Sequence, residues 1–430
     1  MFPTPRWNRF SSLISSLAGN TTIISKNTRT DQVNYCCVYC LSHSFNRMDA
    51  GSSNFLAVAD ESVLVEILSK LPLKSIYRFR CVSKEWNAFT RTSYFLDRHR
   101  LHSSRRLLLI SSSSLADQKP AGISLLADEE TALSSLNIPF LPNDARWDLD
   151  FVGSSNGLVC CNKFLDGNVL AIIVWNPATT QFSYHRHSFE KELENATSYP
   201  LIGFDFMHST NVYKMVEVFP YGSDDPDDPL KLGFGAAVFT QNTPSWRVVE
   251  SRIGLASCKM CYTNQSTTLN GVLYWLVEHT SNGFAVVSFS LHDEAFKDIC
   301  KSLPEEICYV SDNSILPTLV SWRNSLAVVG VDQGDNLVLW VDSTADQESD
   351  WIEQMRIRWP SLCEGSWLLL RGVWKDQFVF SKKGYEVGAH NEPDNLFLYN
   401  PITEALRKVH GERNNFFRFA VSYAESNVQP

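Results

Sequence analysis

The sequence predicts two domains of different class: a small all-α module of three short helices, followed by a larger all-β domain. Apolar residues recur at helical spacing over about 40 residues that begin near Asp60. After about residue 105, short apolar runs punctuated by Gly, Asn and Pro recur and are typical of strands. We expect a disordered or leader segment at 1–57, the helical module at 58–98, a connecting segment at 99–152 and the β domain at 153–423.

The net charge and the length of the apolar runs argue against nucleic-acid binding and against a membrane span. The 430 residues are 44% hydrophobic and carry a formal net charge of -9. Nucleic-acid binding requires clustered Lys and Arg against the phosphates, so an acidic chain of this kind is not expected to bind nucleic acid. A membrane span requires about 18 or more consecutive apolar residues, and every apolar run here is interrupted sooner.

The N-terminal segment allows two interpretations. The first 30 residues contain Arg6, Arg9, Lys26 and Arg29 and no acid, which is typical of an organellar transit peptide. Alternatively they form an unstructured leader, and Met48 is the start of the folded protein. Eleven Cys residues, an odd number, indicate free thiols in a reducing compartment. We therefore expect the protein in the cytoplasm, the nucleus or both.

The helical module begins with an amphipathic segment. Asp60 can cap the helix, and the apolar residues that follow share one face: Val63, Leu64, Ile67, Leu68 and Leu71. Pro72 ends the helix because it has no backbone donor. A second helix is predicted over 74–82, and Ser83 can cap a third. Three such short helices bury little surface, so we expect the module to complete its core against another chain.

The β domain contains a recurring unit in which an apolar strand meets a polar turn and a second strand. The five units start at Val174, Val238, Phe289, Leu339 and Leu398. The intervals of about 50 to 64 residues are close to the roughly 50-residue blade of kelch repeats, which predicts a propeller-like domain. Two units carry Asn-Pro turns, at 176–179 and 400–403, which is hairpin chemistry.

One stretch matches a catalytic motif in its letters. Residues 153–157 read Gly-Ser-Ser-Asn-Gly, the G-x-S-x-G pattern of a hydrolase nucleophile. That motif requires a strand before the serine and a helix after it. Here an apolar strand-like run follows, so we predict a turn that enters a strand and no catalytic residue.

Several groups of residues resemble metal sites without completing one. They are the pairs Cys37 and Cys40, Cys258 and Cys261, His185 and His187, and the acidic stretch 222–229. The cysteine pairs are far apart, the histidines have no evident third ligand, and the acidic stretch has no calcium-loop glycine. No glycine-rich phosphate loop occurs either. We expect no metal and no cofactor.

A basic stretch stands out in this acidic chain. Only Glu85 and Asp97 oppose the cations Lys74, Arg78, Arg80, Lys84, Arg91, Arg98, Arg100, Arg105 and Arg106. Such a run is commonly a solvated helix face. It would also suit an acidic protein partner, since complementary charge speeds association.

Residues 60–86, DESVLVEILSKLPLKSIYRFRCVSKEW, closely resemble the F-box motif in its plant form. The positions that match are Glu66, Ile67, Leu68, Leu71, Pro72, Lys74, Ser75, Arg78, Phe79, Val82, Ser83, Lys84 and Trp86. The motif opens with Leu-Pro, whereas Val58 and Ala59 stand here, so this departure predicts a looser first turn and a weaker affinity for the adaptor. Residues 153–423 resemble the F-box-associated domain of plant proteins, through GSSNGLVC, WNPAT and LNGVLYW.

This resemblance implies a substrate receptor of an SCF-type ubiquitin ligase. Its F-box would bind the Skp-family adaptor and, through it, a cullin scaffold, while the β domain would hold an unknown target protein. The chain itself would carry no catalytic residue. The resemblance assigns adaptor binding to Leu64, Ile67, Leu68, Leu71, Pro72, Leu73, Phe79, Val82 and Trp86. The alternatives are a β-propeller enzyme or small-ligand binder, and an F-box protein that acts outside a ligase.

Overall fold

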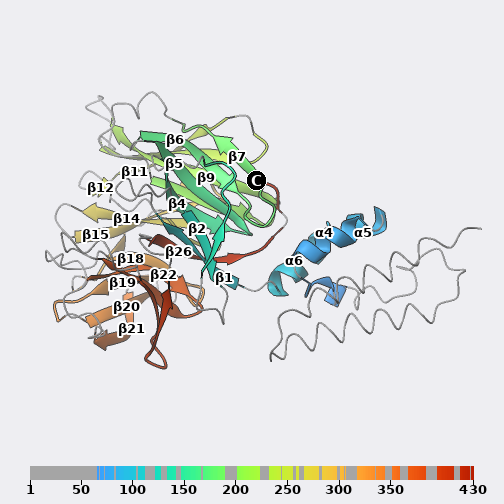
Figure 1. The fold of residues 1–430 in the computed structure, drawn as a ribbon. Helices are drawn as coiled ribbons and strands as arrows, with labels where there is room; N and C mark the ends of the chain where they lie inside the picture. The colour runs from blue at the N-terminus through green and yellow to red at the C-terminus, as the bar shows by residue number, and fades with distance from the viewer. Residues whose placement is uncertain are drawn as a thin grey trace, which may run out of the picture. The chain divides into compact units, whose positions relative to one another are not determined.

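The computed structural model divides the chain into two compact units, residues 1–102 and 103–430. The first contains helices and the second contains strands (Figure 1). The described residues are 65–66, 68–71, 73–81, 84–102, 105–111, 122–126, 133–141, 147–165, 168–188, 201–222, 232–243, 245–254, 258–260, 266–279, 283–297, 301–304, 306, 317–334, 336–343, 351–358, 367–383, 395–410, 417–426 and 428–430.

The helical unit contains helices α4 (Leu73–Arg80), α5 (Lys84–Phe89) and α6 (Ser93–His102). The helices predicted over 74–82 and from Ser83 correspond to α4 and α5. Of the first predicted helix, Val65, Glu66 and Leu68 are helical, and its earlier residues lie outside the described part. Helix α6 was not predicted, and it carries the helical unit beyond the expected limit at residue 98.

Thr92 explains why the chain turns from α5 into α6. Its hydroxyl donates to the carbonyl of Phe89 at 2.8 Å, which ends α5, and accepts from the backbone of Phe95 at 3.3 Å. A threonine that accepts a bond from the N3 amide is a helix N-cap. The ends of both helices are therefore satisfied by one side chain.

The β unit consists of six antiparallel sheets, or blades, among the described residues. Blade 1 contains β26 (Phe417–Ala424), β1 (Arg105–Ser111), β2 (Gly122–Leu126) and β3 (Ser134–Leu136). Blade 2 contains β4 (Trp147–Ser155), β5 (Leu158–Leu165), β6 (Asn168–Trp175) and β7 (Phe182–His185). Blade 3 contains β8 (Leu201–Met207), β9 (Val212–Gly222), β10 (Leu232–Thr240) and β11 (Arg247–Gly254).

The remaining blades follow in chain order. Blade 4 contains β12 (Cys258–Met260), β13 (Thr267–Leu269), β14 (Val272–His279), β15 (Gly283–Ser290), β16 (Ala295–Phe296) and β17 (Lys301–Ser302). Blade 5 contains β18 (Thr318–Trp322), β19 (Ser325–Val331), β20 (Asn336–Asp342) and β21 (Trp351–Arg358). Blade 6 contains β22 (Trp367–Trp374), β23 (Gln377–Lys383), β24 (Asn395–Asn400) and β25 (Ala405–His410).

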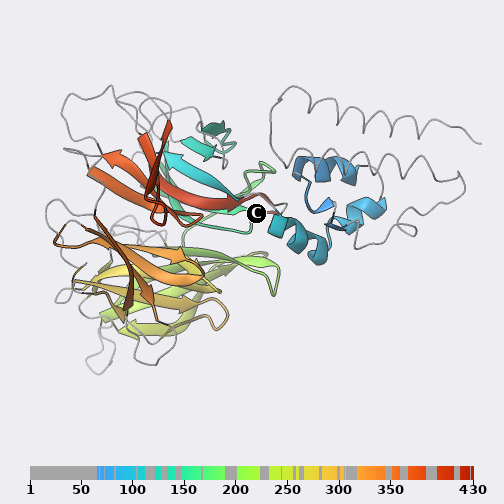
Figure 2. The same cartoon turned by 90° about the horizontal axis from the view of Figure 1, so that it is seen from below.

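The blades form a closed ring. Their inner strands contact one another in the order β26, β4, β8, β13, β18, β22 and back to β26. The ring closes in blade 1, where β26 pairs with β1 from Arg105 opposite Ala424 to Ser111 opposite Phe417. Figure 2 shows the red C-terminal strand beside the cyan β1. The predicted all-β, propeller-like domain is thus confirmed as a six-bladed propeller.

A hydrophobic cluster fills each of the six interfaces between neighbouring blades. Alternate residues of one strand enter different clusters, since successive side chains of a strand point to opposite faces. In β5, Val159 and Cys161 pack toward blade 1, and Leu158 and Cys160 pack toward blade 3. Both faces of such a sheet are buried, which explains apolar runs without polar alternation.

The recurring unit of the sequence is the connection between the third and fourth strands of a blade. Its five starts lie in β6, β10, β15, β20 and β24, the third strands of blades 2 to 6. In blade 6, Asn400 Oδ1 accepts the backbone N–H groups of Ile402 and Thr403 at 2.9 and 3.2 Å. Blade 1 lacks the pattern because its fourth strand, β3, has three residues.

The β unit begins earlier than the sequence predicted. The expected connecting segment, 99–152, contains the end of α6, strands β1 to β3 and most of β4. The strands of blade 1 escaped recognition because their partner strand, β26, lies about 300 residues away in the sequence.

The C-terminal residues are fastened to blades 2 and 3. The side-chain amide of Asn176 donates to the carbonyls of Ser426 and Val428 at 3.0 and 2.8 Å. The Ser426 hydroxyl donates to the carbonyl of Asn156, and Gln241 donates to the carbonyl of Gln429 at 3.0 Å. Asn176 Oδ1 also accepts the backbone N–H of Ala178 at 2.9 Å, so this side chain supports its own turn and holds the C-terminal segment.

Gly157→Ala tests this attachment. Gly157 has φ of +76°, and a Cβ there would lie 2.7 Å from the backbone nitrogen of Ser426. Left-handed strain costs about 1 kcal/mol, and overpacking adds about 1–3 kcal/mol. We expect a loss of about 2–4 kcal/mol in the free energy of unfolding, measured by urea denaturation.

Gly271→Ala is the matched control. Gly271 occupies the same place in an Asn-Gly turn, with φ of +75° and nothing within 4 Å of a Cβ. It should lose only about 1 kcal/mol, from backbone strain. Equal losses in the two variants would show that the contact with Ser426 contributes nothing.

Candidate functional site

The structure places the nine expected adaptor-binding residues in three groups. Leu68, Leu73 and Trp86 are buried within the helical unit. Leu71 and Phe79 are half-buried and pack against its core. The other four, Leu64, Ile67, Pro72 and Val82, lie outside the described residues.

The helical unit has a small core of its own. The buried members are Leu68, Ile76, Trp86 and Phe95, and half-buried Leu71, Phe79, Phe89 and Leu96 pack around them. A residue that is buried in this core presents little side-chain surface to a partner. The half-buried side chains are therefore the apolar surface that remains for an interface, and a direct contact by Leu68, Leu73 or Trp86 stays a prediction.

A ring stack and a hydrogen bond fix the positions of Phe79 and Leu71. Phe79 stacks on Trp86 with ring centroids 5.4 Å apart. His99 Nε2 lies 2.9 Å from the carbonyl oxygen of Leu71, and its ring stacks on Phe95. His99 is only 6% exposed, so α6 anchors the segment around Leu71. The sequence pattern missed both His99 and Phe95, which extend the core beyond the three predicted helices.

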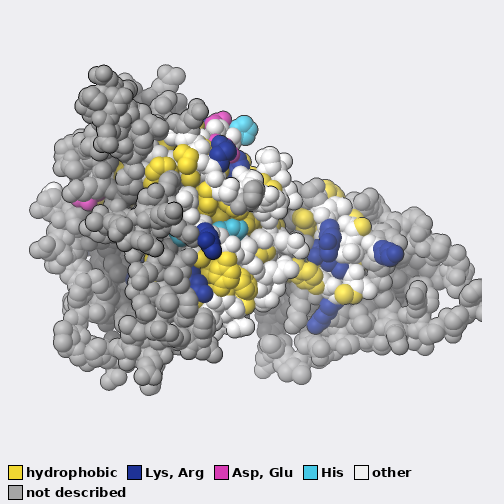
Figure 3. All heavy atoms as spheres, turned by 90° about the horizontal axis from the view of Figure 1, so that it is seen from above, with side chains coloured by type: hydrophobic (Ala, Val, Ile, Leu, Met, Phe, Trp, Pro, Cys, Tyr) yellow, Lys and Arg dark blue, Asp and Glu magenta, His cyan; other side chains and the backbone are white. Residues whose placement is uncertain are grey.

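The basic stretch divides between the two units. Arg106 belongs to β1 and pairs with Glu425 at 3.0 Å. In the described part of the helical unit, Lys70 pairs with Glu66 at 2.6 Å. Arg78, Arg80, Lys84, Arg91 and Arg98 make no ion pair with a described carboxylate, and the side chains of Glu85 and Asp97 lie outside the described part. Figure 3 shows Lys and Arg side chains, and no Asp or Glu side chains, on the visible described surface of this unit.

The nucleophile-like glycine stretch forms a hairpin. Residues 153–155 end β4, Asn156 and Gly157 make the turn, and β5 follows at Leu158. Asn156 and Gly157 both have positive φ, as two-residue hairpin turns require. The strand-to-helix turn of a hydrolase nucleophile is therefore not formed here, as predicted.

The histidine pair does not form a metal site, and the cysteine pairs lie outside the described side chains. His185 Nε2 contacts Ser183 Oγ at 2.8 Å and Tyr213 Oη at 3.0 Å, while His187 contacts Glu217. Cys37, Cys40 and Cys261 lie outside the described residues, as does the side chain of Cys258. Within the described part, no three His, Cys, Asp or Glu residues are grouped to hold a metal ion.

His187 and Glu217 form a buried polar pair between blades 2 and 3. His187 Nδ1 lies 2.6 Å from Glu217 Oε1, and their side chains are 3% and 0% exposed. The backbone and hydroxyl of Ser188 both donate to Glu217 Oε2. A buried carboxylate is costly unless its oxygens are hydrogen-bonded, and here both are. Glu217 on β9 therefore holds the segment that leaves β7.

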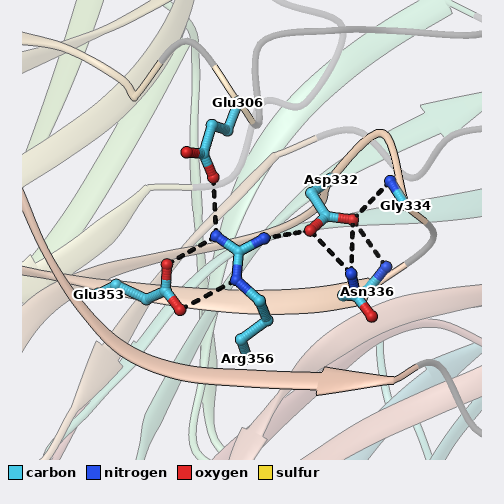
Figure 4. A network of polar contacts seen from close by, with 6 residues as sticks. All are labelled: Glu306, Asp332, Gly334, Asn336, Glu353 and Arg356. Atoms are coloured by element: carbon cyan, nitrogen blue, oxygen red, sulfur yellow. Dashed lines mark hydrogen bonds and ion pairs between the residues drawn. The ribbon is translucent and has the colours of Figure 1, made fainter.

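Arg356 centres a second polar network, in blade 5 (Figure 4). Its guanidinium contacts Glu306 at 2.7 Å, Glu353 at 2.6 Å and Asp332. Asp332 also accepts the backbone N–H groups of Gly334 and Asn336, both at 2.8 Å. The hydrogen bond from Arg356 lowers the pKa of Glu353. This network joins the β19–β20 turn to β21, so we interpret it as a structural feature of blade 5.

Comparisons with known proteins identify both units. The F-box domain matches residues 60–98, and the F-box associated beta propeller domain matches residues 121–430. The second match covers more than half of the chain and agrees with the six-bladed ring. The chain therefore belongs to the F-box protein family that carries an F-box associated β-propeller.

Relatives in Arabidopsis thaliana agree with this assignment. F-box protein At5g49610 is 27% identical over 58% of this chain and 66% of its own length. F-box/kelch-repeat protein At3g23880 is 24% identical over 73% of this chain and 81% of its own length. The chain thus matches just under two thirds of the first relative.

Among solved structures, TolB from Acinetobacter baumannii is similar at a TM-score of 0.43 and 7% identity, covering 80% of this chain and 73% of TolB. So weak a likeness carries no functional argument. No helix in the described part of the chain is long and apolar enough to cross a membrane.

Glu217→Ala tests the buried polar pair. It leaves His187 and Ser188 without their acceptor, and each buried donor left unsatisfied costs about 1–3 kcal/mol, so about 3–5 kcal/mol in total is expected. We expect a loss of that size in the free energy of unfolding of the β unit. Glu278→Ala on β14 removes an exposed carboxylate instead and should change stability by less than about 0.5 kcal/mol.

The thiols of blade 2 should resist alkylation. Burial raises the pKa of Cys160 well above its ordinary value, and burial raises the pKa of Cys161 as well. At pH 8.5 both therefore hold less thiolate than a free cysteine, and the thiolate is the reactive form. Iodoacetamide should label exposed Cys81 before Cys160 and Cys161, which should be labelled only after unfolding, as read by peptide mass spectrometry.

Proposed function

We propose that the chain is the substrate-recognition subunit of an SCF-type E3 ubiquitin ligase. The observation that carries the proposal is the combination of an F-box, with half-buried apolar side chains at Leu71 and Phe79, and a separate six-bladed β unit. The F-box binds a Skp-family adaptor, which links the chain to a cullin scaffold. The β unit binds a target protein, and the ubiquitin transfer occurs on other subunits.

The mechanism is positioning. Tethering a target beside the transferring enzyme replaces a bimolecular encounter by a local one, at an effective concentration up to about the millimolar range. Such a receptor needs two separate binding surfaces and no transition-state chemistry of its own. We place its action in the cytoplasm, the nucleus or both.

The adaptor interface rests on the half-buried apolar side chains. Leu71 is held by the contact of its carbonyl with His99, and Phe79 is held by Trp86. Apolar side chains that are fixed in place lose little entropy on binding, which favours them as anchors.

Co-purification with a Skp-family adaptor and a cullin tests the proposal. The full chain should retain both proteins. The double variant Leu71→Ala with Pro72→Ala should lose the adaptor, while circular dichroism shows that the strand content is unchanged. Ile402→Ala, at a 65% exposed apolar residue of the β unit, should bind as the wild type does.

The outcomes separate the alternatives. Failure of the wild-type chain to bind any Skp-family adaptor would reject the receptor role and favour an enzyme or a small-ligand binder. Adaptor binding without a cullin would indicate an F-box protein that acts outside a ligase. Affinity capture of the full chain under proteasome inhibition would then identify the target.

A further inference from the structure

Strand β7, the outer strand of blade 2, exposes two neighbouring aromatic side chains. Phe182 is 37% exposed and Tyr184 is 50% exposed, and their ring centroids lie 5.4 Å apart at an interplanar angle of 86°. The other large hydrophobic residues that are exposed in the described part of the β unit belong singly to three other blades: Val248, Ile352 and Ile402. Single exposed apolar residues are ordinary, whereas apolar side chains that gather on one surface mark interaction sites.

The short fourth strand of blade 1 explains this exposure. Neighbouring blades normally cover both faces of a blade, but β3 has only three residues. The chain after β3 covers β7 in part, with the buried ring of Phe140 5.4 Å from that of Phe182. The opposite face of β7 is covered by blade 3, where His185 Nε2 lies 3.0 Å from the hydroxyl of Tyr213. Only the side of β7 that faces blade 1 therefore offers aromatic surface.

Contacts with β5 and with the chain after β3 hold the aromatic side chains in place. The Tyr184 hydroxyl donates to the carbonyl of Phe140 at 3.3 Å, and Lys163 Nζ on β5 donates to the same carbonyl at 3.0 Å. Lys163 Nζ also lies 5.4 Å from the centre of the Tyr184 ring. Side chains that are ordered before a partner arrives lose little conformational entropy on binding, which suits anchor residues.

Strand β7 is also an edge strand. It ends blade 2, and no described strand pairs with its outer side. The backbone N–H of Asn176 donates to the carbonyl of Gln181 at 2.9 Å, which fixes the phase of the ladder between β6 and β7. Phe182 and Tyr184 therefore occupy the non-hydrogen-bonded pairs of this antiparallel ladder. Their backbone N–H and C=O groups point away from β6, where an added strand can pair with them.

A cation continues the row of aromatic side chains. Arg186 is exposed and lies two residues after Tyr184, so its side chain lies on the same side of the chain as Phe182 and Tyr184. The Trp246 indole N–H donates to the backbone carbonyl of Arg186 at 2.7 Å and fixes this end of the row. A guanidinium carries five donors in a planar fork, so Arg186 can bind a carboxylate beside its other contacts. An acidic group is the partner that suits this position.

We propose that β7 binds an extended segment of the target protein as an added strand. This inference rests on the proposed function and names the class of target segment. Apolar side chains at alternate positions of the segment pack against Phe182 and Tyr184, and an acidic residue two positions further pairs with Arg186. The backbone bonds supply affinity, while the aromatic contacts and the carboxylate supply specificity.

Peptides selected by phage display against the purified full chain test the inference. The selected peptides should carry two apolar residues two positions apart, with Asp or Glu two positions further. In fluorescence anisotropy, Phe182→Ala with Tyr184→Ala, the aromatic variant, should raise the Kd of a selected peptide at least about tenfold, because it removes both anchors. Val248→Ala truncates an exposed residue of β11 in blade 3 and should leave the Kd within about twofold of wild type.

Two further measurements leave the aromatic side chains of the protein intact. N-methylation of single peptide amides should weaken binding at every second residue, because only alternate amides of an added strand face β7. Arg186→Glu should weaken binding of the acidic peptide. A peptide with Lys in place of the acid should then bind this variant more tightly than it binds the wild-type chain, because the charges are again opposite.

Several results would overturn the inference. Failure to select any peptide, or an equal Kd for the wild type and the aromatic variant, would reject β7 as the binding surface. Equal effects of N-methylation at every position would exclude an added strand. A dimer in sedimentation velocity that the aromatic variant abolishes would assign β7 to a second copy of the chain. Failure of the wild-type chain to bind a Skp-family adaptor would instead reject the proposed function, whatever the peptides do, which distinguishes the two failures.

Discussion

The pairing of β1 with β26 is the constraint on which the β unit depends. Every blade presents two apolar faces, and each face is buried only because a neighbouring blade covers it. If blade 1 lacked its inner strand, the clusters that it shares with blades 2 and 6 would both open to water. Asn176, Ser426 and Gln241 reinforce the same closure by tying the C-terminal segment to blades 2 and 3. Local packing in all six blades therefore depends on one long-range contact.

The sequence predicted structural elements whose signals lie within a few residues, and it missed elements that depend on partners far away in the chain. The five turn units were found because each combines a continuous apolar strand with a polar turn, and both signals lie within a few residues. Blade 1 was missed because its inner strand comes from residues 417–424 and because β3 is short. Helix α6 was missed because six of its ten residues are polar or charged, and one of these, His99, is buried beside Phe95.

The sequence also predicted only part of the candidate site: its motif identified residues, but their packing required the structure. The F-box motif identified the apolar residues of the helical unit, but a motif does not say which of them are used internally. Leu68 and Trp86 are buried in the core of the helical unit, while Leu71 and Phe79 remain partly exposed. His99 lies beyond the motif and contributes a contact to the carbonyl of Leu71 across 28 residues. The excess of cations in the helical unit, in contrast, was visible in the sequence.

The position of β26 near the C-terminal end has a consequence for synthesis on the ribosome. Strands β1 and β2 emerge early, yet their sheet waits for an inner strand about 300 residues later. At about 5–20 residues per second this interval lasts roughly 15–60 s. During this interval strand β1 has an open edge, because β26 has not yet been synthesised. Its residues Leu107, Leu108 and Leu109 are fully buried in the folded protein. Nascent chains should therefore depend on chaperones that shield such an edge, and premature termination should yield aggregating fragments.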